Sequence, residues 1–168
     1  MDKKNYLPPL VCGFGAAVLT TVPGVKSFGC CLIVPLAAIL SLILDHKINK
    51  TALPFKFKNA MLLGLLTGIF AAFFATFFDV LMTYIIHTNE FVQTLPQTEE
   101  LVRQYKLGVL FNQTMEMLKQ MSKDIQQSGF SLFYTAGIFF SNFIINSIFG
   151  TLGGLLGLSF INKRYQKK

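Results

Sequence analysis

The sequence predicts an all-α membrane protein with four transmembrane helices and an extracytoplasmic amphipathic helical segment between spans 3 and 4. Three observations lead to this prediction. Hydrophobic residues make up 52% of the 168 residues, and charged residues only 14%. The mean hydropathy is +0.53, which is too apolar for a chain of this length to hide from water. The third observation is that basic residues are concentrated in alternate connections between four apolar stretches.

The four apolar stretches are the predicted spans. The first opens with Pro8 and Pro9, which suit the first turn of a helix, and Pro23 stops it. The turn 23–27 makes the first two spans a tight antiparallel pair. Each has roughly 25 Å of helix at 1.5 Å per residue, so whether they fully cross the bilayer stays open. The predicted spans are about 7–22, 28–44, 59–86 and 130–161, within a single transmembrane helical domain 1–168.

The distribution of Lys and Arg predicts the orientation. The N-terminus, the second connection and the C-terminus hold ten of the fifteen basic residues. Basic connections stay on the cytoplasmic side, so both termini are expected inside and the segment 87–129 outside. The net charge of +7 therefore belongs to the inner face, where we expect it to attract anionic lipids rather than nucleic acid.

Small residues recur every four positions along the third predicted span, on the side opposite a stripe of Leu and Phe. The fourth span carries two overlapping Gly-x-x-x-Gly pairs. In lipid, such faces let two helix backbones approach closely. We expect them to pack spans three and four together or against the first hairpin, or else to dock another protein or a second copy. The predicted helix-packing residues are Ala60, Gly64, Gly68, Ala72, Gly150, Gly153, Gly154 and Gly157.

Polar side chains within the predicted spans form the candidate polar or ion site. Asp79 is the only ionisable residue inside a predicted span, and charges within the membrane are costly enough to be functional candidates. It is expected to be a hydrated interfacial carboxylate, a structural partner of span four, or a proton or cation site. Asn142 and Asn146 lie on one side of span four and predict either helix-to-helix hydrogen bonds or, together with Asp79, a hydrated pathway.

The outer segment, about 97–127, is predicted to be helical. Thr98 is a candidate N-cap, Gly108 a break, and Asn112 the cap of a second helix with apolar and methionine residues at steps of three and four. Such a face can cover the bundle, lie on the outer leaflet, or hold a partner through adaptable methionine contacts.

No catalytic, cofactor or metal site is predicted. Cys12, Cys30 and Cys31 form no Cys-x-x-Cys pair, and neither His46 nor His87 lies near them in the sequence. No nucleophile, base or oxyanion group converges in any motif. A cleavable signal peptide is also not expected, because no small-x-small site precedes a soluble domain.

The layout resembles a family of small four-span bacterial membrane proteins known only as a domain of unknown function. The resemblance rests on the Gly- and Pro-punctuated first hairpin with Cys30-Cys31, the basic inner loop, the run 57–68, the charged outer segment and the Gly-rich last span that ends in Lys-Arg. It covers nearly the whole chain, implies a bacterial inner-membrane location, and brings no functional residues.

Two classes of function follow. The leading hypothesis is a non-catalytic accessory or assembly subunit of a membrane complex, with a membrane-protein partner or a second copy as its contact. The alternative is a small oligomeric transporter or channel that uses Asp79, Asn142 and Asn146. A membrane enzyme ranks third, because both histidines lie in connections without a carboxylate or thiol partner in sequence.

Overall fold

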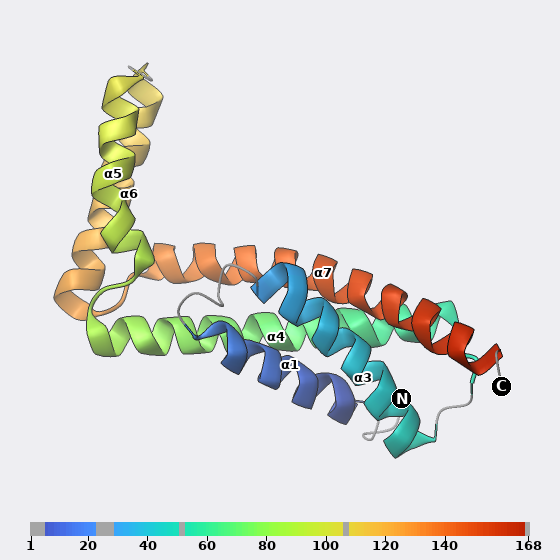
Figure 1. The fold of residues 1–168 in the computed structure, drawn as a ribbon. Helices are drawn as coiled ribbons and strands as arrows, with labels where there is room; N and C mark the ends of the chain where they lie inside the picture. The colour runs from blue at the N-terminus through green and yellow to red at the C-terminus, as the bar shows by residue number, and fades with distance from the viewer. Residues whose placement is uncertain (1–5, 23–28, 51–52, 106–107, 167–168) are drawn as a thin grey trace. The chain divides into compact units, whose positions relative to one another are not determined.

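Every regular element that the structure describes is helical (Figure 1). The structure is a computed structural model that describes residues 6–22, 29–50, 53–105 and 108–166, so the predicted turn 23–27 lies outside the described residues. The all-α prediction is confirmed for these ranges. The elements are α1 (Leu7–Thr20), the short π-helix η2 (Gly29–Ile33), α3 (Val34–Asn49), α4 (Phe57–Ile86), α5 (Glu90–Gln104), α6 (Gly108–Ser128) and α7 (Leu132–Gln166).

Three of the described helical stretches are long and apolar enough to cross a membrane. They are Cys31–Asn49, Phe57–Ile86 and Leu132–Lys163. Helix α1 is also apolar but has only 14 residues, or roughly 21 Å at 1.5 Å per residue. A hydrocarbon core is about 30 Å thick, so α1 is short for a complete crossing.

The chain divides into two compact units. Unit 1 comprises Met1–Phe78 and Phe139–Lys168, and unit 2 comprises Asp79–Ile138. Helices α4 and α7 contribute to both units, whereas α1, η2 and α3 belong to unit 1 and α5 and α6 to unit 2.

The N-terminal part of unit 1 is a helical hairpin. Helix α1 carries its prolines in the first turn, where the missing N–H of proline leaves no hydrogen bond unmade. Helices α1 and α3 pack against each other. A Cβ built on Gly29 would lie 2.5 Å from Cγ2 of Thr20, so the start of η2 touches the end of α1. The two arms are therefore antiparallel (Figure 1).

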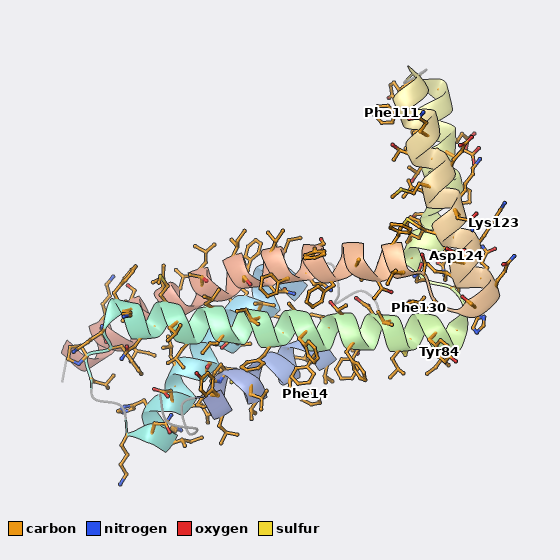
Figure 2. The ribbon with its side chains drawn as sticks, turned by 180° about the vertical axis from the view of Figure 1, so that it is seen from behind. Phe14, Tyr84, Phe111, Lys123, Asp124 and Phe130 are labelled. Carbon is orange, nitrogen blue, oxygen red and sulfur yellow. The ribbon has the colours of Figure 1, made fainter. Side chains whose placement is uncertain are left out.

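The interior of unit 1 is built largely from small side chains. One core cluster consists of Ala16, Val34, Ala37 and Ala71. A second consists of Leu42, Phe55, Ala60 and Leu63. Helix α1 adds an aromatic contact, where the rings of Phe14 and Phe74 meet edge to face at 5.2 Å; Phe14 is labelled in Figure 2.

The exterior of unit 1 carries the large apolar side chains. On α7, exposed hydrophobic residues recur at every fourth position: Phe140, Ile144, Ile148, Leu152, Leu156 and Phe160. If it were exposed to water, so long an apolar stripe would promote aggregation, whereas hydrocarbon solvates it. A core rich in alanine, with most of the large apolar side chains outside, therefore suits a bundle surrounded by lipid.

Unit 2 contains a second helical hairpin, formed by α5 and α6, which pack against each other. Glu99 of α5 and Lys119 of α6 form an ion pair of 2.7 Å. Because both side chains are partly exposed, the pair contributes little stability, and the apolar contacts dominate. The buried hydrophobic residues of the hairpin are Val92, Leu95, Met115, Met121 and Ile125.

The N-terminus of α5 differs from the sequence prediction. The backbone N–H of Val92 donates to Oδ1 of Asn89 at 3.0 Å, so Asn89 is the N-cap. Thr98 lies inside the helix, where its hydroxyl donates to the carbonyl of Thr94 at 3.1 Å. The prediction that Thr98 is the cap is wrong because α5 continues through Pro96. The cap predicted at Asn112 also lies inside a helix, since α6 begins at Gly108.

The cap assignment predicts opposite effects for two alanine substitutions. Asn89→Ala should lower the free energy of unfolding of unit 2 by about 1 kcal/mol, because the N–H of Val92 loses its acceptor. Thr98→Ala should be neutral or slightly stabilising, because alanine has the higher helix propensity. Hydrogen exchange of the first-turn amides of α5 measures both. Faster exchange in the Thr98 variant than in the Asn89 variant would refute the assignment.

Candidate functional site

The contact between α4 and α7 in unit 1 is made by glycine against backbone. A Cβ built on Gly150 would lie 2.6 Å from the carbonyl oxygen of Gly64 and 2.8 Å from Cα of Gly68. A Cβ built on Gly64 would lie 2.9 Å from Cα of Gly154. No side chain fits at these distances, so the two backbones touch directly. The contacts run in opposite directions along the two helices, which makes α4 and α7 antiparallel (Figure 1).

The same contact extends along α4 in both directions. A Cβ built on Gly68 would meet the carbonyl oxygen of Asn146 and would lie 3.0 Å from Cα of Ser147. A Cβ built on Gly154 would meet the carbonyl oxygen of Ala60. Ala60 is fully buried, as is Ala72 further along α4. Dispersion contacts between closely spaced backbones can hold these helices together without a hydrophobic driving force.

Two further glycines of α7, Gly153 and Gly157, contact α3. A Cβ built on Gly153 would lie 2.5 Å from Cα of Pro35. A Cβ built on Gly157 would lie 2.7 Å from Cδ1 of Leu42 and 3.3 Å from Cα of Ile39. Residues 150 and 154 therefore serve the contact with α4, and residues 153 and 157 serve the contact with α3. The structure places the predicted small residues in contacts within one chain.

Gly13 in α1, which was not among the predicted packing residues, also makes a close contact of this kind. A Cβ built there would lie 2.8 Å from Cβ of Phe70 and 2.9 Å from the backbone nitrogen of Ala71. Gly13 thus lets α1 approach α4 closely. Its signal in the sequence is the short spacing to Ala16 and Ala17, which are also buried.

The polar stripe of α7 takes part in the packing of unit 1. The side-chain amide of Asn142 donates to Oγ1 of Thr76 in α4 at 3.0 Å. Asn146 is buried, with 7% of its surface exposed. The hydroxyl of Thr67, on the same buried side of α4, donates to the carbonyl of Leu63 at 2.7 Å. Polar groups that bond in this way do not need water.

Asp79 belongs to unit 2, whereas Asn142 and Asn146 belong to unit 1. The carboxylates of Asp79 and Glu90 interact electrostatically with the hydroxyl of Tyr134. The ring centroid of Tyr134 lies 5.4 Å from that of Phe91. Asp79 is therefore found beside the N-terminal turns of α7, in a polar and aromatic neighbourhood.

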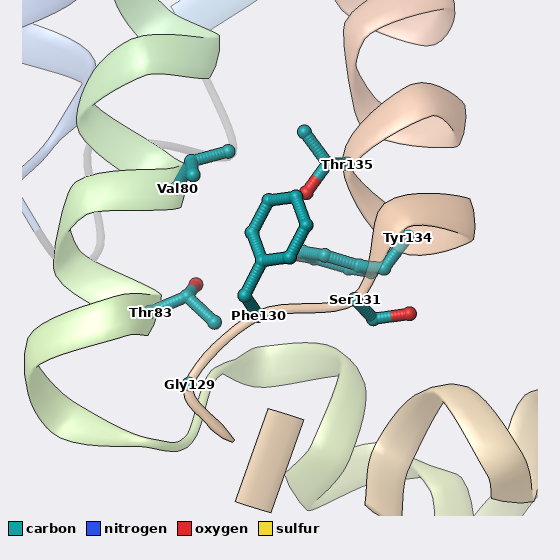
Figure 3. Close-up of a pocket in the computed structure, with 7 residues that line it drawn as sticks. All are labelled: Val80, Thr83, Gly129, Phe130, Ser131, Tyr134 and Thr135. Atoms are coloured by element: carbon teal, nitrogen blue, oxygen red, sulfur yellow. The ribbon is translucent and has the colours of Figure 1, made fainter. Parts of the chain in front are cut away.

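A small depression lies near this end of α4 and α7 in unit 2. It is too narrow to hold a water molecule, and its lining residues are Val80, Thr83, Gly129, Phe130, Ser131, Tyr134 and Thr135 (Figure 3). Gly129 makes the turn before α7 with φ +72°, a conformation in which only glycine is unstrained. The depression is a packing feature and offers no space for a ligand.

A second acidic residue, Asp45, lies inside a candidate span. Helix α3 continues to Asn49, beyond the predicted end of the span at residue 44. Asp45 has 4% of its surface exposed, and Oδ1 accepts a hydrogen bond of 2.6 Å from the side-chain amide of Asn49. The longer candidate span Cys31–Asn49 therefore contains a carboxylate that lies just beyond the predicted span. His46 and Lys47 after Asp45 suit the negative end of a helix and could have signalled the extension.

The end of unit 1 where α3 stops and α4 starts is joined to α7 by a pair of hydrogen bonds. The backbone N–H of Phe55 donates to Oδ1 of Asn162 at 2.9 Å, and the side-chain amide of Asn162 donates to the carbonyl of Phe55 at 3.1 Å. The imidazole of His46 lies edge-on to the ring of Phe55 at 6.4 Å. Three chain segments are thus fixed to one another at this end.

No group of three or more potential ligands for a metal ion occurs among the residues that the structure describes. The comparisons with known proteins add no relative: no family model matches the chain, and neither a curated protein nor a solved structure matches it significantly.

The glycine contacts predict a large difference between two alanine substitutions. Gly68→Ala should lower the free energy of unfolding by about 1 to 3 kcal/mol, because the methyl group would collide with the backbone of α7. Gly137→Ala should be neutral or stabilising by up to about 1 kcal/mol, because nothing lies within 4 Å of a Cβ at that position. Unfolding in detergent micelles, followed by circular dichroism, measures both. Equal transitions in the two variants would exclude close packing at Gly68.

Proposed function

We propose that the chain is a non-catalytic polytopic membrane protein that serves as an accessory or assembly subunit of a membrane complex. The observation that carries this proposal is that the polar stripe of α7 is engaged in helix packing, through the bond from Asn142 to Thr76 and the burial of Asn146. A packed bundle with an apolar exterior suits structural contact with lipid and other membrane helices.

The proposed topology has four crossings, with both termini in the cytoplasm of a bacterial cell. Neither 59–102 nor 124–162 contains Lys or Arg, and each of the three long candidate spans has lysine at or beside the end that we place inside. We include α1 as the first crossing because, with only three crossings and a cytoplasmic C-terminus, the basic N-terminus would lie outside. We place the protein in the bacterial inner membrane because its layout resembles that of the small four-span bacterial membrane proteins.

The proposed contact surfaces are the exterior of the bundle and the α5–α6 hairpin. Exposed apolar side chains on the hairpin are Leu101, Tyr105, Phe111 and Met117, of which Phe111 is labelled in Figure 2. A membrane-protein partner or a second copy would cover such residues, and anionic lipids would meet the basic inner end.

The alternative function is a small oligomeric transporter or channel. Asp79 favours it, because this carboxylate lies within the candidate span Phe57–Ile86, and ionisable groups within membrane-spanning helices often mark ion pathways. In an oligomer, Asp79, Asn142 and Asn146 of several copies would have to line one wet path.

Cysteine accessibility tests the topology. In a background with Cys12, Cys30 and Cys31 replaced by serine, Asp2→Cys and Lys168→Cys should resist a membrane-impermeant thiol reagent in intact cells, because we place both ends inside. Glu100→Cys should react, because we place α5 outside. Labelling of Asp2→Cys would reduce the number of crossings to three, and protection of Glu100→Cys would reverse the topology.

Flux measurement separates the two functions. The purified full chain in liposomes should give no ion or proton flux above that of empty vesicles, because the asparagines of unit 1 are packed. The wild-type chain from gentle detergent extraction should migrate with a stoichiometric partner or as a defined homo-oligomer. Flux that Asp79→Asn and Asn142→Leu abolish, and the exposed-site control Ser159→Ala retains, would establish the alternative.

A further inference from the structure

The inner end of unit 1 presents a group of exposed lysines. They come from the end of α3, the start of α4 and the end of α7, and we call them the lysine surface: Lys47, Lys50, Lys56, Lys58 and Lys163. The nearest described carboxylate in sequence, Asp45, is buried and bonded to Asn49. The lysine surface therefore combines positive charge from three separate chain segments.

The paired hydrogen bonds between Phe55 and Asn162 hold these segments together. Lys56 directly follows Phe55, and Lys163 directly follows Asn162. Two cations that are far apart in the chain are thus anchored beside the same pair of bonds. These two part-buried bonds restrict the backbone at Phe55, whereas the backbone of a free basic tail keeps its freedom.

Apolar side chains flank the same lysines. Phe57 is 60% exposed and Phe160 is 68% exposed, and each lies two residues from a member of the hydrogen-bonded pair. Ile48, between two of the lysines, is 43% exposed. A ligand that satisfies both groups must carry a negative charge and an apolar chain together. Free phosphate and nucleic acid offer no apolar partner for these residues.

We propose that the lysine surface and its aromatic neighbours form a discrete binding site for an anionic phospholipid. The phosphate group is bound by lysines anchored at Phe55 and Asn162, and an acyl chain lies along Phe57 and Phe160. This inference rests on the membrane placement proposed above. It adds a defined binding site, whereas the proposed function includes only a diffuse attraction of anionic lipids to the basic end.

Native mass spectrometry of the delipidated full-length protein tests the site, with phosphatidylglycerol as the probe and phosphatidylcholine as its neutral competitor. The wild-type chain should retain phosphatidylglycerol in preference. Lys56→Gln/Lys163→Gln should lose this preference by about fivefold per lysine, the factor to which about 1 kcal/mol corresponds. The control Lys119→Gln/Lys123→Gln removes the same charge from α6 and should retain it. Lys123 is visible on α6 in Figure 2.

The variant Asn162→Ala tests whether the site is discrete. It keeps every charge and removes only the two hydrogen bonds to Phe55, so the preference should fall several-fold if those bonds build the site. An unchanged preference in Asn162→Ala, or equal losses in the two lysine variants, would overturn the discrete site. If Asn162→Ala does not fold, the comparison of the lysine variants decides.

Two further measurements distinguish the lipid site from simple phosphate binding and from membrane insertion. Inorganic phosphate should not displace the bound lipid, and displacement would show that the apolar neighbours contribute nothing and would overturn the proposal. Flotation with vesicles of phosphatidylcholine alone should recover every variant, because insertion does not depend on the site. A wild-type chain that does not float would refute the membrane placement, whereas flotation without any preference for phosphatidylglycerol would refute only the lipid site.

Discussion

Direct contact between the backbones of α4 and α7 is the constraint on which unit 1 depends. At Gly64 and Gly150 there is no space for a single methyl group, so the separation and direction of these helices are set by the absence of side chains. Helix α3 then packs on the adjacent side of α7 through Gly153. Hydrocarbon gives helices no reason to associate by burial alone, so van der Waals contact over a smooth face must supply the attraction. The large apolar residues are left for the exterior.

Two asparagine side chains of unit 1 make hydrogen bonds that connect separate parts of the chain. The amide of Asn142 reaches Thr76 across the α4–α7 contact, and the amide of Asn162 reaches the backbone of Phe55 at the other end of the bundle. In surroundings with few competing water molecules each of these bonds specifies a register. Glycine thus brings the helices together, and asparagine determines how far along one another they lie.

The sequence was informative about elements and less informative about their partners. Apolar continuity predicted a helix at 59–86, and α4 is Phe57–Ile86, because membrane-length helices leave a strong one-dimensional signal. The four-residue spacing of the glycines marked a smooth face but could not say which helix lies on it. Gly13 and Asn162 were missed because their roles arise from residues distant in the chain. The cap at Asn89 was missed because the helix was expected to begin at Thr98, whereas α5 begins at Glu90 and passes through Pro96.

The central position of α7 has a consequence for biosynthesis. Helices α3 and α4 both lie against the glycines of α7, yet α7 follows them in the chain and leaves the ribosome after them. Their contact faces must wait in the translocation machinery or in the bilayer without that cover. Unit 1 therefore assembles only once the last helix has been inserted. Ribosome stalling or truncation before α7 would leave a nascent chain whose uncovered faces are available to chaperones and to quality-control proteases.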